Sequence, residues 1–155
     1  LSDRPGGQGI GGLSYVFGEI AQQTLDITLR TNVLFSRSQS LELYMQPFIT
    51  VGDYTNAREL AKADSYDLVP YAEAGYEAAD NDFSFSAFNL NAVYRYEYRP
   101  GSTFYLVWAH GRSGYMERSF ASSPSQFENS LSTDELFNNE PENLFLAKVS
   151  YWFSL

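Results

Sequence analysis

Apolar and polar residues alternate along several stretches of the chain, and this period of two is typical of β-strands with one apolar face. The clearest stretch covers residues 25 to 35. Residues 41 to 51 repeat the pattern, although Pro47 cannot donate to a strand ladder and is typical of an edge or a bulge. The expected apolar faces are Leu25, Ile27, Leu29, Thr31, Val33 and Phe35, and then Leu41, Leu43, Met45, Pro47, Ile49 and Val51.

Further stretches show the same alternation with different regularity. In residues 85 to 98 the apolar positions include Phe88, Leu90 and Ala92, whereas residues 103 to 112 are apolar on both faces and leave their phase open. Residues 15 to 21 are irregular, and "NLFLAKVSYWFSL" closes the chain with a second clear apolar stripe. The pattern predicts strands at about 15–21, 25–35, 41–51, 85–98, 103–112 and 143–153.

The segments between the expected strands alternate between short and long. Residues 36–40 and 99–102 are short turns, and "RPGS" is a tight-turn signal. Residues 52–83 and 113–142 are long acidic loops, in which "NARELAKAD" could form a short helix and "STDE" a capping box. Residues 1–13 are expected to be a flexible glycine-rich lead-in. Short turns at one end and long loops at the other are typical of outer-membrane barrels, whose strands need about 9–11 residues to cross the membrane.

Alternation alone does not decide whether the apolar face contacts lipid or packs into the hydrophobic core of a soluble domain. Three asymmetries favour lipid: aromatic residues gather at the short-turn end, charges of both signs share the polar face, and the last strand ends on the short-turn side. A soluble antiparallel β-barrel or sandwich that binds a ligand stays open as the alternative. The expected aromatic girdle is Tyr94, Tyr96, Tyr98, Tyr151 and Phe153, and the expected lumen-facing polar network is Asp26, Arg30, Glu42, Arg95, Glu97, Arg99 and Lys148.

Composition further restricts which classes of protein this chain can belong to. The 155 residues carry a net charge of −9, which argues against nucleic acid, and no cysteine, which excludes disulfides and thiolate metal sites. No apolar run is long enough for a transmembrane helix, and no leader is visible before the initial leucine, so we expect a mature product or a fragment. Because five or six strands cannot close a membrane barrel, the remaining strands of a larger barrel are expected as partners.

Several phrases resemble a known family. "YVFGEIAQQTLDITLRTNVLFSRSQSLELYMQPFITVGDYTNAREL", "AVYRYEYRPGSTFYLVWAHGR" and "PENLFLAKVSYWF" are similar to the C-terminal barrel region of the bacterial outer-membrane family called domain of unknown function 5916. Its members usually carry an N-terminal carbohydrate-binding family 9-like domain, and no such module lies in these residues.

The resemblance implies an outer-membrane location, a periplasmic C-terminus and contact with the barrel-assembly machinery, but no settled activity. The barrel-insertion signal would be Ala147, Val149, Tyr151, Phe153 and Leu155, with leucine where the last residue is usually aromatic.

Candidate chemistry is sparse. His110 could be combined with Ser113 or Ser119, but chance supplies such triplets easily, so we expect no enzyme, with an outer-membrane hydrolase not excluded. Asp80 and Asp82 are weak candidates for a bound cation, and no metal or cofactor is expected. We expect a channel or transport-associated barrel, linked to saccharides only through a domain outside this chain. A non-conducting outer-membrane scaffold, whose long loops would bind a protein or saccharide partner, is the alternative.

Overall fold

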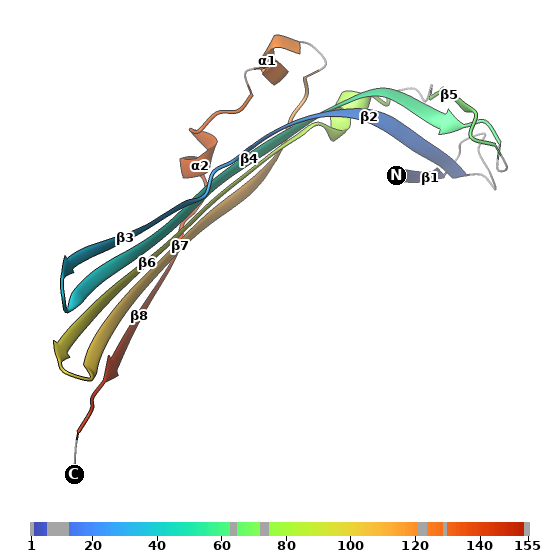
Figure 1. The fold of residues 1–155 in the computed structure, drawn as a ribbon. Coiled ribbons are helices and arrows are strands. Elements are labelled where there is room, and N and C mark those ends of the chain that lie inside the picture. The colour runs from blue at the N-terminus through green and yellow to red at the C-terminus, as the bar shows by residue number, and fades with distance from the viewer. Residues whose placement is uncertain are drawn as a thin grey trace. The chain divides into compact units, whose positions relative to one another are not determined.

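A computed structural model describes residues 2–5, 13–62, 65–71, 75–120, 124–128 and 130–153 (Figure 1). In this part of the chain, nearly all regular structure is β-strand, and the helices have four or five residues each. None of the helices described is long and apolar enough to cross a membrane. The strands are β1 (Ser2–Pro5), β2 (Leu13–Asp26), β3 (Leu29–Ser36), β4 (Gln39–Leu60), β5 (Leu68–Pro70), β6 (Phe83–Arg99), β7 (Ser102–Glu117) and β8 (Glu142–Ser150). The helices are a 3₁₀ turn, η2 (Ala78–Asn81), and the α-helices α1 (Pro124–Glu128) and α2 (Glu135–Asn138).

The strands form one antiparallel sheet in the order β1-β2-β4-β6-β7-β8, and β3 and β5 also pair with β4. The expected all-β antiparallel class is therefore confirmed. Among the described residues β8 ends this order and pairs with β7 alone, so the sheet is not closed. The unpaired edge of β8 exposes a row of backbone donors and acceptors.

The chain divides into two compact units, each of which is described by itself. The turn-side unit comprises residues 24–49, 85–114 and 132–155, and it contains both short hairpin turns. The loop-side unit comprises residues 1–23, 50–84 and 115–131.

Backbone pairing in the turn-side unit shows which side chains share a face. In the β3–β4 hairpin Leu29 lies opposite Met45, and in the β7–β8 pair Trp108 lies opposite Phe145. Opposite residues of an antiparallel pair point to the same side of the sheet. The even-numbered residues of β7 therefore join the apolar stripe of β8, which fixes the phase that the sequence left open.

A small core confirms that these stripes meet. Ile49 of β4, Phe88 of β6 and Leu136 of α2 form a buried cluster, with Leu25, Met45 and Leu90 packed around it. The Phe88 ring also contacts His110 of β7, with ring centroids 5.9 Å apart. The face of the turn-side unit that carries Leu25, Ile49 and Phe88, with the stripes of β3 and β8 placed by register, is called the apolar face below. The alternate residues form the polar face.

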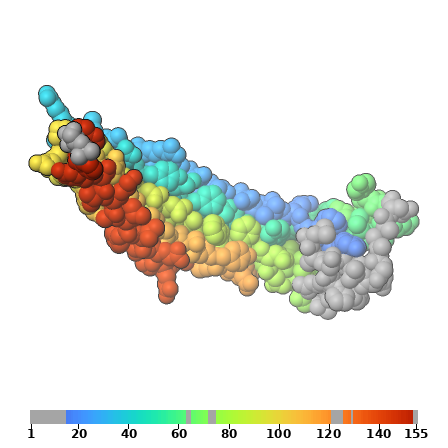
Figure 2. Space-filling model, turned by 90° about the horizontal axis from the view of Figure 1, so that it is seen from below, coloured from blue at the N-terminus to red at the C-terminus, as the bar shows by residue number. Residues whose placement is uncertain are grey.

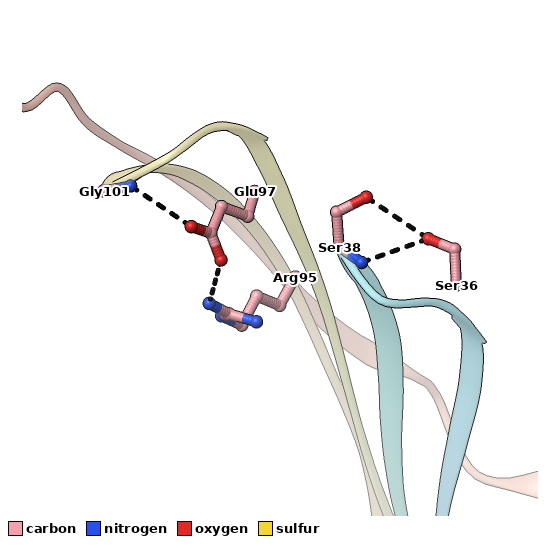
Figure 3. A network of polar contacts seen from close by, with 5 residues as sticks. All are labelled: Ser36, Ser38, Arg95, Glu97 and Gly101. Carbon is pink, nitrogen blue, oxygen red and sulfur yellow. Dashed lines mark hydrogen bonds and ion pairs between the residues drawn. The ribbon is translucent and has the colours of Figure 1, made fainter.

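Side-chain hydrogen bonds hold each of the two hairpin turns (Figure 3), and one backbone hydrogen bond joins the turns. At the first turn the Ser36 hydroxyl accepts the Ser38 N–H at 3.2 Å, and the Ser38 carbonyl accepts the Glu97 N–H at 2.8 Å. At the second turn the Glu97 carboxylate accepts the Gly101 N–H at 3.1 Å. Gly101 has φ of +77°, which the turn requires after Pro100 and which favours glycine.

Several elements differ from the sequence expectation. β4 continues to Leu60 rather than ending near residue 51, so the first five residues of "NARELAKAD" are strand where a helix was suggested. The reason is tertiary: β5 pairs with Arg58–Leu60, and strand pairing overrides a local helical preference. β6 and β7 also run to Phe83 and Glu117, so the expected loops 52–83 and 113–142 are partly strand.

Three smaller differences concern ends and breaks. β1 pairs with Leu13–Val16, so part of the expected flexible lead-in is a strand, and residues 6–12 lie outside the described residues. The expected strand 25–35 breaks at Ile27 and Thr28. The Ile27 N–H donates to the Pro47 carbonyl at 3.2 Å, but Pro47 has no N–H to donate in return, so the strand ladder is interrupted there. No side-chain cap forms in "STDE": the N-cap of α2 is Asp134.

The turn at Gly101 can be tested against a second glycine. Gly101→Ala places a Cβ about 3.1 Å from the Trp152 Cβ in addition to the positive φ, whereas Gly75, at φ +85°, has nothing within 4 Å of an added Cβ. We expect Gly75→Ala to lower the free energy of unfolding by about 1–2 kcal/mol and Gly101→Ala to lower it by more. Urea titration followed by tryptophan fluorescence measures both. Equal losses would contradict the contact with Trp152.

Candidate functional site

The candidate site is the polar face of the turn-side unit. Its first part is a row of contacts across β2, β3 and β4. The Gln46 amide donates to the Asp26 carboxylate at 3.1 Å and accepts from the Tyr44 hydroxyl at 2.7 Å. The Arg30 guanidinium lies 5.2 Å from the centre of the Tyr44 ring, within the range of a cation–π contact. Two of the predicted network residues, Asp26 and Arg30, are therefore linked through two uncharged neighbours.

A second part lies on β6. Arg95 and Glu97 form an ion pair with an N–O distance of 3.1 Å, and Arg95 also hydrogen-bonds the Tyr105 side chain. Both side chains keep about a third of their surface exposed, so the pair contributes little to stability by itself. The pair instead contacts the hairpin turn, because the other carboxylate oxygen of Glu97 accepts the Gly101 N–H.

Between these parts the polar face is hollowed. A hollow of about 540 Å³ opens beside the β3–β4 hairpin and reaches β6. Its rim carries charges of both signs, Arg30 and Glu42, together with the amides of Asn32 and Asn91. Such a surface can hydrate or guide a small polar solute, because it offers donors and acceptors side by side. The lining residues are Arg30, Thr31, Asn32, Glu42, Leu43, Tyr44, Asn91 and Val93.

The remaining predicted network residues have other neighbours. Lys148 of β8 lies opposite Tyr105 in the β7–β8 register. Arg99 reaches the Tyr151 hydroxyl, at 3.2 Å. The sequence prediction listed only charged residues and so omitted Tyr44 and Gln46, although alternation places them on the same face. Tyr105 is placed on this face only by its register with Lys148.

The predicted aromatic girdle lies at the turn end of the unit. The rings of Tyr96 and Tyr98 are 6.4 Å apart, as are those of Tyr151 and Phe153, and the Tyr98 hydroxyl donates to the Ser150 carbonyl at 3.2 Å. β8 is exposed along its whole length, and its residues, in red, lie at the surface in Figure 2. Of the predicted insertion signal, Leu155 lies outside the described residues.

A second aromatic group lies farther from the turn on the same apolar face. The Trp108 and Phe145 rings are stacked with an interplanar angle of 5° and centroids 6.1 Å apart. The Trp108 indole N–H donates to the Asn143 side chain at 2.9 Å. Sequence analysis did not single out these residues, because the phase of β7 was unknown.

His110 has partners at both ring nitrogens. Nδ1 lies 2.9 Å from the Asn143 side-chain oxygen, and Nε2 accepts the Arg112 Nε–H at 3.0 Å. The ring edge also contacts Phe88 and Trp108. This is the surrounding of a structural histidine in a polar and aromatic cluster rather than of a general base beside Ser113 or Ser119.

Asp82, one of the two weak cation candidates, is a structural acceptor in the loop-side unit. Its side chain is fully buried; one carboxylate oxygen accepts the Tyr54 N–H at 2.6 Å and the other accepts the Phe120 N–H at 2.7 Å. Its carbonyl also accepts the Arg118 N–H. Asp80 accepts the Glu77 N–H at 3.3 Å at the start of η2. Among the described residues, no three acidic, histidine or cysteine side chains are grouped as metal ligands.

The buried carboxylate of Asp82 affects its neighbour Asp53. Partial burial, and secondly the negative charge of Asp82, raise the pKa of the Asp53 carboxyl above its ordinary value of 3.8. The folded protein therefore holds a proton on Asp53 at a pH where the unfolded chain has released it.

Most of the chain matches a family model. The model described as a domain of unknown function (DUF5916) covers residues 10–154. The chain belongs to the DUF5916 family. No curated protein and no solved structure matches it. Membership of DUF5916 confirms the resemblance noted in the sequence, and it names no activity.

Asp82 gives a test of the loop-side unit. Asp82→Ala leaves two buried N–H groups without an acceptor, and we expect the free energy of unfolding to fall by about 2–4 kcal/mol. Asp82→Asn keeps one acceptor oxygen and should lose less. Hydrogen exchange at the Tyr54 and Phe120 amides measures the local effect. Unchanged protection of both amides in Asp82→Ala would contradict this role.

Asp53 gives a test that depends on pH. Because its pKa is higher in the folded protein, the free energy of unfolding should fall as pH rises through the interval above 3.8. We expect Asp53→Asn to remove this part of the fall and to raise stability at pH 7. The measurement is the urea midpoint at several pH values. Asp67→Asn, at an exposed position, is the control for loss of one charge. Identical pH profiles for wild type and Asp53→Asn would rule the effect out.

Proposed function

We propose that this chain is part of a bacterial outer-membrane β-barrel that is a channel or is associated with transport. Its apolar face meets lipid and its polar face lines the lumen. The observation that carries the proposal is the separation of the two faces in one sheet. In the turn-side unit the buried cluster and the Trp108–Phe145 ring pair lie on one side, and the Arg95–Glu97 ion pair and the Asp26–Gln46 hydrogen bond lie on the other.

The exposure of the apolar face supports lipid as its neighbour. Leu29 is 51% exposed and Val149 is 66% exposed, and Val33, Phe35, Leu106 and Phe145 are exposed as well. A continuous exposed apolar patch is uncommon on a monomeric soluble protein, since each Å² left in water costs about 25 cal/mol. Hydrocarbon removes this cost.

The length of the apolar face fits a membrane. The part of β4 in the turn-side unit, residues 39 to 49, spans eleven positions, which is about 36 Å of strand at about 3.3 Å per residue. At a tilt of about 45° this length covers about 25 Å, the height of the apolar band of an outer-membrane barrel. The expected girdle tyrosines lie at the turn end of this band, which we assign to the periplasmic interface.

An open sheet cannot remain in lipid, where each unpaired backbone group costs several kcal/mol. We therefore propose that the free edge of β8 pairs with other strands of the same, larger barrel. The barrel-assembly machinery would insert the last strand, with the C-terminus in the periplasm and the long loops outside the cell.

One observation favours the soluble alternative. α2 lies on the apolar face, where Leu136 is only 4% exposed against Ile49 and Phe88. In a soluble module, helices would cover the whole face in this way. Here the contact is confined to the end of the face far from the turns. In the membrane model α2 therefore lies just above the hydrocarbon.

Heat modifiability tests the barrel. The full-length protein in detergent is run on a gel with and without boiling. A closed barrel migrates faster unheated, because its sheet resists the detergent. Equal migration, together with a monomer that stays soluble without detergent, would support the soluble module instead.

Conductance in planar bilayers tests the lumen. We expect single-channel currents whose cation preference rises in Arg30→Glu, because Arg30 lies on the rim of the hollow. Arg37→Glu, in the exposed short turn, makes the same charge change away from the polar face and should leave selectivity near wild type. Heat-modifiable protein without any current would favour the non-conducting scaffold.

A further inference from the structure

The loop-side unit has a hollow of its own, separate from the polar face described above. It has a volume of about 510 Å³, within the range of small-molecule sites. Four aromatic rings line it, those of Tyr54, Tyr76, Phe83 and Tyr115. Nothing in the barrel proposal uses these rings.

Three of the rings, those of Tyr54, Phe83 and Tyr115, contact one another, and the Tyr76 ring contacts Tyr71. Phe83 and Tyr115 are stacked with centroids 6.0 Å apart and an interplanar angle of 14°. Tyr54 is tilted by 47° to Phe83 at 6.4 Å. Tyr115 is 61% exposed, so the group is open to a ligand rather than closed into a core.

Local structure holds this arrangement in place. A Cβ at Gly52 would overlap the Phe83 ring, so glycine lets the ring lie against the β4 backbone. Asp82 precedes Phe83 and fixes the backbone of Tyr54 with its short hydrogen bond. The Asn81 amide donates to the Tyr76 hydroxyl at 3.2 Å.

The charged side chains that line this hollow are both acidic, and Arg118 lines a neighbouring hollow that shares Asp80 and Glu117. Asp80 and Glu117 are both exposed. Among the described residues that line the hollow of the four rings there is no lysine, arginine or histidine. Ring faces carry partial negative charge, so rings and carboxylates together attract a cation with an apolar surface. An anion would be repelled.

We propose that this hollow binds an organic cation of the alkylammonium class, with its apolar surface against the four rings and its charge near Asp80 and Glu117. The proposal does not rest on the barrel function. It requires only the loop-side unit as described.

The test uses choline chloride and its uncharged isostere 3,3-dimethyl-1-butanol with the full-length protein in low-salt buffer. Titration calorimetry should show choline binding at least about tenfold more tightly than the isostere, because only choline gains the cation–π and carboxylate attraction. Equal binding of the two, or no heat from choline up to about 100 mM, well above the millimolar range of weak sites, would overturn the proposal. So would binding of a neutral sugar as tight as that of choline.

Variants connect the binding to the hollow. Tyr115→Leu should weaken choline binding about 3- to 30-fold, Glu117→Gln should weaken it less, and Tyr115→Phe should keep it near wild type. Tyr66→Leu is the matched control, since Tyr66 is 99% exposed and lies outside the lining. Circular dichroism checks that each variant folds. Choline binding that is unchanged in both Tyr115→Leu and Glu117→Gln would show that the cation binds elsewhere.

Discussion

Antiparallel register is the constraint on which the rest of the turn-side unit depends. Because side chains alternate along every strand, a shift by one residue would move each stripe to the other face. Leu29 opposite Met45 and Trp108 opposite Phe145 keep the stripes together. The two hairpin turns hold this register, and the hydrogen bond from Glu97 to the Ser38 carbonyl links them. The separation of an apolar face from a polar face follows from these pairings.

Local alternation was sufficient to predict the strands near the turns and to say which of their residues share a face. It failed where pairing partners are distant in sequence. β4 continues to Leu60 because β5 supplies a partner, and no pattern within "NARELAKAD" reveals that partner. The phase of β7, apolar on both faces, needed the register with β8. Alternation did place Asp26 and Arg30 on one face, but it could not show that Gln46 and Tyr44 connect them.

In the loop-side unit, sequence-based prediction fails for a different reason. In "DNDF" the sequence offers two carboxylates, and oxygen ligands for a cation are the obvious chemistry. Burial changes the role of Asp82, because a carboxylate removed from water needs donors, and the N–H groups of Tyr54 and Phe120 supply them. The same placement brings Phe83 against Gly52. Partial burial, and secondly the charge of Asp82, raise the pKa of the Asp53 carboxyl. Each of these contacts joins segments 28 or more residues apart, a distance at which local patterns carry no information.

The open edge of β8 and the exposed apolar face each need a neighbour that the described residues do not supply. β8 pairs with β7 alone among the described strands, and rings such as Phe145 stay exposed. Water can hydrogen-bond the backbone groups of the edge but leaves the apolar rings exposed to a polar solvent. Lipid gives the rings an apolar neighbour but leaves the backbone groups of the edge without hydrogen bonds. Additional strands over the edge and hydrocarbon over the face would together supply both. An assembled barrel in a membrane meets this double condition, and a soluble module meets it only by covering far more of the face than α2 does.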